Sequence, residues 1–472
     1  MTPPPAAPAL ASGIMPGAGA ANAPIRLIRQ AVTSALPTLE GARPGRLVSL
    51  SIPLPADAAG DLAAYDVGTR WLSPAAGMTL LGRGRAWSAE AVGTEEIERL
   101  SRRLEDERAD WQVVDLDVRF PPHAFFTHSF PQAGFPARVV LWVPTLLAQQ
   151  RHGETMITLT ARRTADAPLV AVARRWLNEA ERMLAARAAG RHVNVRGKVR
   201  RIDEDPDQEL WLDRVRATIA AIAAGRFDKA VLARRVTALL PGRTDLSRIV
   251  AQLARRYPDC NVFALPHEAG HVVAASPERL AVKHGSSIVS HALAGTVRRD
   301  PDPLIDEQLA RQLLDCPKER SEHAFVVEAI AATLHDICRR VSHPKTPTVM
   351  RLRHVQHLWT PVSGWLRPGT GLLDAVARLH PTPAVAGFPR QAAVGWLDEI
   401  GERRGGCYTG AAGWIDAEGD GEAAVVLRSA FIEDDVATLW AGAGIVAQSQ
   451  PWRELAETEM KLAALLEVLT EE

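Results

Sequence analysis

The sequence predicts an α+β fold, on the evidence of its composition and of the way its strand-like runs follow one another. Of the 472 residues, 47% are hydrophobic and 23% are charged, close to the averages for globular proteins with a large core. Two strand-like runs, 423–431 and 437–441, are neighbours near the C-terminal end, as in a hairpin. Because hairpin neighbours pair antiparallel, an α+β fold fits better than a doubly wound parallel one.

The charge balance and the cysteines argue against several classes of protein. The chain has 55 Lys and Arg against 55 Asp and Glu and a pI near 7.3, which argues against nucleic acid as a partner. No apolar run approaches the roughly 18 residues that a membrane helix needs, so no membrane association is expected. Cys260, Cys316, Cys338 and Cys407 are scattered without CxxC spacing, which argues against a zinc finger or a disulfide scaffold and favours a reducing cytoplasm.

The first 210 residues carry no chemical motif. Residues 1–24 contain 17 Ala, Pro or Gly and no charged side chain, so we expect a disordered leader; a signal peptide would need a positive start that is missing. Strands are expected at 47–52 and 137–143 in the variable part, 25–210. Ten charged residues crowd 191–209, which predicts an exposed connection.

From residue 211 onward the secondary structure is better defined. Trp211, Val215, Ile219 and Ile222 recur at helical spacing, and the run 230–236 is typical of a strand. Further strands are expected at 271–275, 279–282, 423–431 and 437–441, and further helices at 306–314, 318–339 and 453–468.

Two of these helices each carry a pair of glutamates three residues apart. Glu322 extends an apolar stripe with Glu319 one turn earlier, and Glu454 and Glu457 precede Lys461 on the last helix. A carboxylate directed at a core needs a cation, a metal or a proton, and oxygen ligands without His or Cys suit Mg²⁺. The spacing by itself favours the plainer alternative of two solvated helix faces with lysine partners.

Other residues could take part in catalysis or binding, but they do not belong to a repeated pattern. Lys229 shares a strand face with Val231, which would partly remove its amine from water, as a base requires. Glu278 follows Ser276-Pro277 at a turn between two strands. The small-residue runs at 294–296 and 442–444 offer backbone N–H groups to ligand oxygens. Taken singly, each is more typical of an exposed side chain or a tight turn.

Taken in order, these residues lie in ten segments that resemble the chorismate-utilising enzymes, which include isochorismate, salicylate, anthranilate and aminodeoxychorismate synthases. The segments are FDKAVLARRV (227–236), ASPERL (275–280), HALAGTVRR (291–299), KERSEH (318–323), VQHL (355–358), LHPTPAVAGFPR (379–390), CYTGAAGW (407–414), VVLRSA (425–430), AGAG (441–444) and ETEMKL (457–462). The form LHPTPAVAG most resembles the isochorismate synthases, and the VQHL region resembles those that feed salicylate-type siderophore synthesis.

The resemblance implies two large antiparallel β-sheets packed together with flanking helices, as in anthranilate synthase component I. It implies one structural domain over 25–472, with the chorismate-binding catalytic region at 211–472. It also implies Mg²⁺ as cofactor, chorismate as small-molecule substrate and no obligatory glutaminase subunit. We expect a cytoplasmic monomer, with a homodimer as the alternative.

The same resemblance implies a role for each matching residue. Lys229 would be the base that activates water, and Glu278 the acid that protonates the departing C4 hydroxyl of chorismate. The principal metal ligands would be Glu322 and Glu457, with Glu319 and Glu454 acting directly or through waters. The residues matching the grip on the enolpyruvyl carboxylate are Tyr408, Arg428, Gly442 and Gly444. Those matching the ring side are Gly295, Thr296 and Lys461, with His357 near the reacting ring or as structural support.

The function expected from the sequence is therefore that of a Mg²⁺-dependent isochorismate synthase, an isomerase. Salicylate synthase, which goes on to eliminate pyruvate, is the nearest alternative. An anthranilate or aminodeoxychorismate synthase subunit is disfavoured because Lys229 stands where ammonia-using relatives have glutamine. A non-catalytic chorismate-binding protein is disfavoured because Lys229 and Glu278 are both present.

Overall fold

The computed structural model describes residues 23–470, except 60–61, 63–64, 66, 115–118, 165–167, 189–198, 243–244, 354 and 406. The expected leader lies outside the described residues as far as residue 22, and its last two residues already belong to helix α1 (Ala23–Glu40). The buried residues of α1 recur every three or four positions, the spacing of a helix that packs one apolar face on a core.

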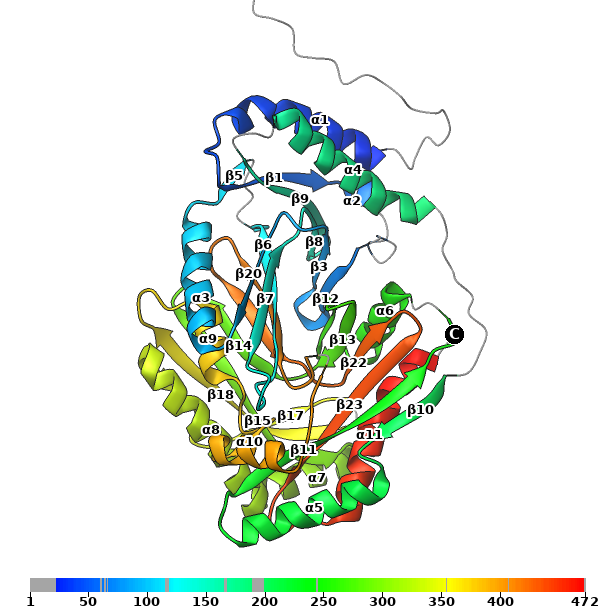
Figure 1. The fold of residues 1–472 in the computed structure, drawn as a ribbon, viewed down its shortest axis with the longest axis vertical. Helices are drawn as coiled ribbons and strands as arrows, with labels where there is room; N and C mark the ends of the chain where they lie inside the picture. The colour runs from blue at the N-terminus through cyan, green and yellow to red at the C-terminus, as the bar shows by residue number, and fades with distance from the viewer. Residues whose placement is uncertain are drawn as a thin grey trace, which may run out of the picture.

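Two sheets form the body of the described chain (Figure 1), and the predicted fold of two large antiparallel sheets with flanking helices is confirmed. The larger sheet contains, in spatial order, β10 (Arg200–Asp205), β11 (Lys229–Leu239), β23 (Val436–Ile445), β22 (Ser429–Glu433), β13 (Gly270–Ser276), β12 (Asn261–His267), β2 (Thr69–Ser73), β3 (Met78–Arg83), β8 (Leu146–Arg151), β9 (Glu154–Arg162), β1 (Leu47–Leu54) and β5 (Gln112–Val114), with β19 (Gly387–Phe388) beside β11. The smaller contains β16 (Cys338–Ser342), β18 (Val355–Leu366), β15 (Ser287–Arg298), β14 (Arg279–His284), β21 (Gly421–Val425), β20 (Ala411–Asp416), β6 (His123–His128), β7 (Arg138–Val143) and β4 (Trp87–Val92), with β17 (Thr348–Arg351) beside β18. Among the described strands only β1 and β5 pair parallel, and both sheets take strands from both sides of residue 210.

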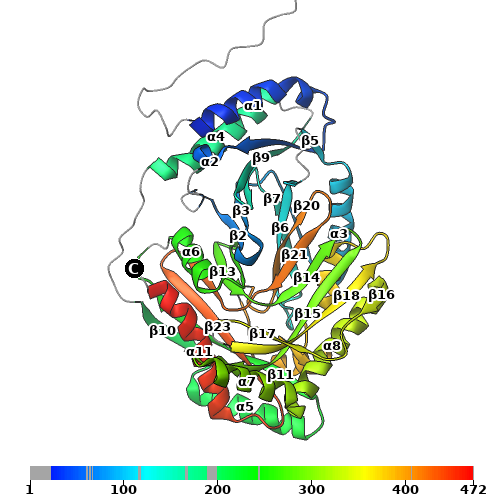
Figure 2. The same cartoon turned by 180° about the vertical axis from the view of Figure 1, so that it is seen from behind.

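Helices cover the outer faces of the sheets (Figures 1 and 2). α1 and α4 (Leu169–Ala188) cover the β1–β9 end of the larger sheet, and α5 (Gln208–Ala223), α6 (Leu246–Arg256) and α11 (Pro451–Thr470) cover its other end. The smaller sheet packs against α3 (Thr94–Ala109), α8 (Pro317–Ile337) and α9 (Leu372–Leu379). The remaining helical segments are α2 (Ala56–Ala59), the 3₁₀ turn η2 (Pro74–Ala76), α7 (Pro303–Asp315) and α10 (Arg390–Glu399).

Aromatic side chains fill the space between the two sheets. Trp71 and Phe263 of the larger sheet stack with ring centroids 4.9 Å apart, and Phe125 and Trp142 of the smaller sheet stack at 6.0 Å. All four are fully buried, and burying each contributes about 2–3 kcal/mol. This layer holds the sheets face to face, so that strands of both can line one cavity.

The prediction of a single strand over 423–431 is wrong, because the segment is two strands in different sheets. β21 ends at Val425 in the smaller sheet and β22 begins at Ser429 in the larger one. Between them Arg428 has a φ of +48°, in the left-handed region, and there the chain crosses from sheet to sheet. Apolar residues on both sides of Arg428 and Ser429 hide such a turn from a pattern based on hydrophobicity. The crossover places Arg428 where the sheets meet.

Part of the expected connection at 191–209 is also wrong, because residues 200–205 form the edge strand β10, which pairs with β11. Its side chains are largely exposed, as expected, but the charges make tertiary contacts. Arg201 Nη1 lies 3.1 Å from Glu459 Oε2 of α11, and Arg234 Nη2 of β11 lies 3.2 Å from Glu204 Oε2. Residues 191–198 of this segment lie outside the described residues.

The other predicted elements are present with shifted ends. The helix expected over 318–339 stops at Ile337, and Cys338 starts β16. The strand expected over 437–441 is longer and runs to Ile445, so that it includes Gly442 and Gly444. All four cysteines are free thiols.

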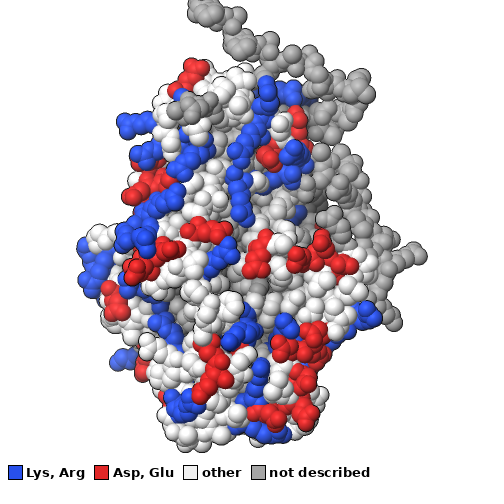
Figure 3. All heavy atoms as spheres, in the orientation of Figure 1, with Lys and Arg blue, Asp and Glu red and all other residues white. Residues whose placement is uncertain are grey.

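The surface and the helices fit the charge and hydropathy of the sequence. On the face shown in Figure 3, Lys and Arg are interspersed with Asp and Glu. Among the described helices, none is both long enough and apolar enough to cross a bilayer.

Candidate active site

A cavity of about 290 Å³ lies where the two sheets meet α8 and α11. It brings together every site residue that the sequence suggested, although these residues span more than 230 positions of the chain. They are Lys229, Glu278, Gly295, Thr296, Glu319, Glu322, His357, Tyr408, Arg428, Gly442, Gly444, Glu454, Glu457 and Lys461. The structure shows that these residues line one cavity, and the role of each side chain remains a prediction.

Lys229 is the first residue of β11, and the alternation of the strand puts it on the cavity side with Val231. Its Nζ donates a hydrogen bond to Glu322 Oε1 at 2.5 Å, and only 10% and 20% of the two side chains are exposed. Burial alone would raise the pKa of Glu322, but the Lys229 charge and its hydrogen bond outweigh burial and lower this pKa. The lysine expected to be a base is therefore ion-paired with a glutamate expected to bind metal.

Glu278 occupies the turn between β13 and β14, as the sequence suggested, but it is buried rather than exposed. Its N–H donates to Ser276 Oγ at 3.3 Å, and its Oε1 accepts from the Thr382 hydroxyl at 3.5 Å. Burial raises the pKa of Glu278 to about 7, against the opposing effects of the Lys229 charge and Thr382. A carboxyl group with this pKa can hold and release a proton near neutral pH.

Gly442 and Gly444 expose backbone N–H groups because of how β23 pairs with β11. Val231 and Ala233 stand opposite these glycines, yet Val231 N–H donates to Ala386 O and Ala233 N–H donates to Glu402 Oε2. The facing pairs are thus of the non-hydrogen-bonded kind, and the glycine N–H groups point away from β11. A Cβ on Gly442 would meet the Tyr408 hydroxyl at 2.8 Å, so glycine also leaves room for that phenol.

Two side chains near these glycines can bind a carboxylate. The Tyr408 ring stacks on Trp440 at 6.1 Å, and burial raises the pKa of its phenol, which therefore stays protonated and can donate a hydrogen bond. Arg428 lines the same cavity from the crossover between sheets. Its guanidinium is suited to bind a carboxylate through two parallel hydrogen bonds.

Gly295, Thr296 and His357 form another part of the wall. The β15–β18 register shifts at Gly295, whose φ is +72°, so the residue acts as a bulge that few side chains would tolerate. Thr296 Oγ1 lies 3.0 Å from His357 Nδ1. Burial, then the Arg428 charge, lowers the pKa of His357 to about 4, so the imidazole is neutral at physiological pH and acts as a hydrogen-bonding group.

Comparison with known families is consistent with this cavity. The profile of the family described as chorismate binding enzyme matches residues 44–470, which is nearly the whole described chain. The chain belongs to the chorismate binding enzyme family.

Several relatives of this chorismate binding enzyme are named isochorismate synthases. It is 35% identical over 266 residues to isochorismate synthase MenF of Bacillus subtilis, covering 56% of each chain, and 37% identical over 264 residues to the salicylate biosynthesis isochorismate synthase of Pseudomonas aeruginosa, covering 56% of this chain and 55% of the other. It is 34% identical to isochorismate synthase EntC of Escherichia coli, covering 56% and 68%. The matched stretch spans little more than half the length of the first two relatives.

Solved structures extend the likeness beyond the matched sequence. MenF, the menaquinone-specific isochorismate synthase of Escherichia coli, superposes with a TM-score of 0.76 at 25% identity, covering 94% of this chain and 99% of the other. Anthranilate synthase component I of Streptococcus pneumoniae superposes with a TM-score of 0.67 at 19% identity, covering 82% and 92%. At that identity the second match shows the fold alone.

The glutamates of this chorismate binding enzyme fit a Mg²⁺ site in donor type and charge. Burial, then the neighbouring Glu322 charge, raises the pKa of Glu319, and burial with a contribution from Glu457 raises the pKa of Glu454. A divalent cation would relieve this repulsion. Among the described residues, no three His, Cys, Asp or Glu side chains converge as a preformed ligand group. Carboxylate oxygens are ligands that Mg²⁺ prefers, usually together with retained waters.

Sequence reasoning missed two threonines in or beside the cavity. Thr409 lines the wall, and Thr382 contacts Glu278 from outside the lining. Thr382 and Thr409 lie inside the segments LHPTPAVAGFPR and CYTGAAGW, so the resemblance marked their neighbourhood. Their contacts depend on chain segments that only the fold brings together.

Proposed function

We propose that this chorismate binding enzyme is an isochorismate synthase, an isomerase that interconverts chorismate and isochorismate with Mg²⁺ as cofactor. The observation that carries the proposal is that a buried lysine and a buried carboxyl group line one cavity together with four glutamates of α8 and α11. The names of the relatives from Bacillus subtilis, Pseudomonas aeruginosa and Escherichia coli support the same reaction.

The two central side chains have complementary proton chemistry. Water adds at C2 of chorismate while the C4 hydroxyl leaves and the ring double bonds shift, so substrate and product are isomers. Lys229 takes a proton from the attacking water, and Glu278 gives a proton to the departing hydroxyl, which leaves as water. The pKa of about 7 for Glu278 keeps enough of the acid form near neutral pH for this role.

Lys229 cannot accept a proton while it donates to Glu322 as an ammonium. Catalysis therefore requires that the lysine leave this ion pair as the neutral amine. Glu322 and Glu457 would hold Mg²⁺, with Glu319 and Glu454 nearby, and the bound ion supplies charge neutralisation for a dicarboxylate substrate. Arg428, protonated Tyr408 and the glycine N–H groups of β23 would bind and orient the second carboxylate.

The decisive experiment incubates the full chain with chorismate and Mg²⁺ and separates the products by chromatography. Isochorismate as the end product supports the proposal. Salicylate with an equal amount of pyruvate would replace it with a salicylate synthase. Product that forms only with added ammonium would show that water is not the nucleophile, and chorismate binding without any product would indicate a non-catalytic protein.

A matched control tests whether the reaction depends on Mg²⁺. The same incubation with EDTA in place of Mg²⁺ should give no product, and added Mg²⁺ should restore it. Independence from a glutaminase subunit, a monomeric or homodimeric state and a cytoplasmic location remain predictions, which size-exclusion chromatography and fractionation of cells would test.

A further inference from the structure

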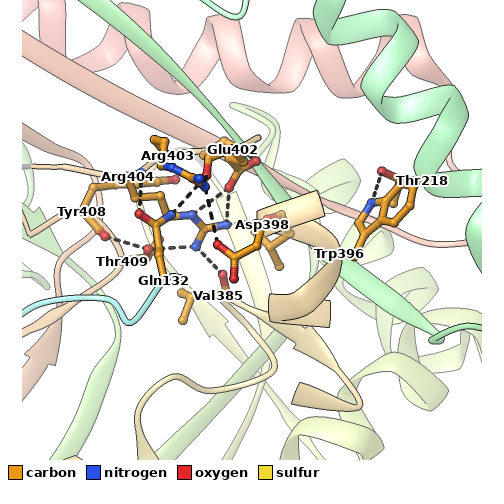
Figure 4. Close-up of polar contacts among 12 residues, drawn as sticks. Gln132, Thr218, Val385, Trp396, Asp398, Glu402, Arg403, Arg404, Tyr408 and Thr409 are labelled. Carbon is orange, nitrogen blue, oxygen red and sulfur yellow. Dashed lines mark hydrogen bonds and ion pairs between the residues drawn. The ribbon is translucent and has the colours of Figure 1, made fainter. Parts of the chain in front are cut away.

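A buried ion pair behind the cavity wall has no place in the reaction described above. Glu402 and Arg404 lie between α10 and β20, and only 2% and 1% of their side chains are exposed. Arg404 Nε donates to Glu402 Oε1 at 2.9 Å, and Nη2 lies 2.8 Å from the same oxygen in an ion pair. Neither residue lines the cavity, so neither can touch a substrate there. Figure 4 shows the pair and its neighbours.

The remaining donors of Arg404 bind three separate parts of the cavity wall. Nη2 donates to Val231 O of β11 at 2.5 Å, and Nη1 donates to Val385 O at 2.8 Å and to Thr409 Oγ1 at 2.9 Å. Val231, Val385 and Thr409 all line the cavity. With the bond from Nε to Glu402, all three nitrogens of the planar guanidinium act as donors. One side chain thus fixes the relative position of three wall segments.

Glu402 completes the connection to the central strand. Its Oε2 accepts the Ala233 N–H at 2.8 Å, on the edge of β11 that faces away from β23. Ala233 stands opposite Gly442, whose backbone N–H is expected to bind substrate. The carboxylate therefore holds both Arg404 and the part of β11 against which β23 pairs.

The Thr409 end of the network holds a strained backbone. Cys407 and Thr409 have φ values of +60° and +56°, which a β-branched threonine rarely adopts. The Thr409 hydroxyl accepts from Arg404 and donates to Tyr408 O at 2.7 Å, while His380 Nε2 lies 2.7 Å from Thr409 O. Such a conformation persists only when its surroundings impose it. Tyr408 sits inside this strained turn.

We propose that Arg404 and Glu402 are positioning residues, which hold Tyr408 and the β11–β23 backbone in the geometry that binds the carboxylate of the substrate remote from the metal. This inference rests on the proposed function, because it takes the group bound beside Tyr408 to be a carboxylate of the substrate. A buried ion pair is weak evidence for stability as such, since desolvation opposes the attraction. Its role here is geometric, because the planar guanidinium of arginine bonds to three segments of the cavity wall at once, which a lysine ammonium cannot do.

The test compares Arg404→Lys with Arg403→Lys, its neighbour in the chain. Both changes keep the charge, but Arg403 is half-exposed and bonds to Asp398 and the Glu402 carbonyl rather than to the cavity wall. We expect Arg404→Lys to lower kcat/KM for chorismate about 100-fold, the order expected for shifting a substrate-positioning group by about 1 Å, with most of the loss in KM. Arg403→Lys should match the wild type.

A second pair of variants guards against misfolding of Arg404→Lys. Thr409→Ala removes the hydroxyl that joins Arg404 to the Tyr408 turn, whereas Thr409→Ser keeps it, so the KM for chorismate should rise more for alanine than for serine. Circular dichroism before each assay identifies the folded variants. The proposal is overturned if folded Arg404→Lys and Thr409→Ala both have the wild-type KM, or if serine is as damaging as alanine. Failure of the wild type to convert chorismate would instead refute the proposed function, which keeps the two failures distinct.

Discussion

Two lysine–glutamate pairs line the same cavity and differ in how the chain makes them. Lys461 and Glu457 are four residues apart on α11, 2.7 Å from each other, with 44% and 41% of their side chains exposed. Lys229 and Glu322 are 93 residues apart, on β11 and α8, and are largely buried at 2.5 Å. The first pair is a local helical contact that the sequence displays, and the second exists only in the folded protein.

The difference matters because burial changes what an ion pair does. A half-exposed helical pair contributes about 0.3–0.5 kcal/mol and is easily exchanged for water or a metal. A buried pair has lost its hydration, so removing one partner leaves a charge without compensation. We therefore expect the Lys229–Glu322 pair to control both activity and stability, and the Lys461–Glu457 pair to affect the binding of metal and substrate with little effect on stability.

The largest effect is expected for Glu322→Gln. This change removes the partner of Lys229 and a proposed metal ligand together, so turnover should fall by about 10⁴-fold, the upper range of acid–base contributions. The free energy of unfolding should fall by about 2–3 kcal/mol, somewhat less than for a fully buried pair. Chemical denaturation and steady-state kinetics measure both. Unchanged stability would mean that the buried pair is no different from the exposed one.

Glu278→Gln comes next and should lower turnover by about 10³-fold while chorismate still binds. In the wild type, activity from chorismate should fall as the pH rises above about 7, because Glu278 must be protonated to act as the acid. Because burial favours the neutral form of Glu278, its raised pKa adds to the free energy of unfolding below about pH 4.5. This contribution is lost as the pH rises through about 7.

The pH profile of Glu278→Gln provides the check. Its residual activity and its unfolding midpoint should both lose the component that titrates near pH 7. If the alkaline fall in wild-type activity survives in this variant, another group is the acid. Glu433→Gln, an exposed change at the end of β22, is the matched control and should retain the wild-type profile.

Glu457→Gln tests the half-exposed pair in the same comparison. We expect the affinity for Mg²⁺ to fall 10- to 100-fold, as for loss of one metal-associated side chain, with the free energy of unfolding changed by less than about 0.5 kcal/mol. Titration with Mg²⁺ and denaturation of the metal-free protein separate the two quantities. A loss of stability as large as that of Glu322→Gln would remove the distinction between the pairs.

The smallest effect is expected for Gly444→Ala. The new Cβ would lie 2.9 Å from Lys229 Cε, at the flexible end of the lysine, so the amine shifts while the fold is retained. Turnover should fall about tenfold, a fraction of the cost of a full 1 Å misplacement. Gly395→Ala in α10, where the Cβ meets no atom within 4 Å, should leave activity unchanged. Equal activity of both variants would show that the position of the amine is not critical.

Much of the fold followed from local pattern. The strands at 271–275 and 279–282 and the helices at 306–314 and 453–468 were predicted because their apolar residues repeat with the period of the element. The prediction of one strand at 423–431 was wrong because apolar residues lie on both sides of the change of sheet, and hydrophobicity does not record the φ of Arg428. The strand β10 was predicted as part of a connection because charged edge strands and charged linkers have the same composition.

The candidate site was predictable as a set of residues but not as a set of contacts. Glu322 and Glu457 were found because paired glutamates on apolar helices are chemically conspicuous and because the segments around them resemble a known family. The burial of Glu278 was missed, since a turn acid is exposed by default and only the packing of β13, β14 and Thr382 removes it from water. Arg404 was missed because a charged residue in a polar segment has no signal of burial.

The sequence by itself determined which elements form, which helix faces are apolar and which family the residue order resembles, because propensity, periodicity and motif order are properties of neighbouring residues. Tertiary structure alone decided that Lys229 meets Glu322, that burial raises the pKa of Glu278 and that one arginine joins three walls. These outcomes depend on the distance and hydration of groups far apart in the chain, and both are set only when the two sheets close on each other.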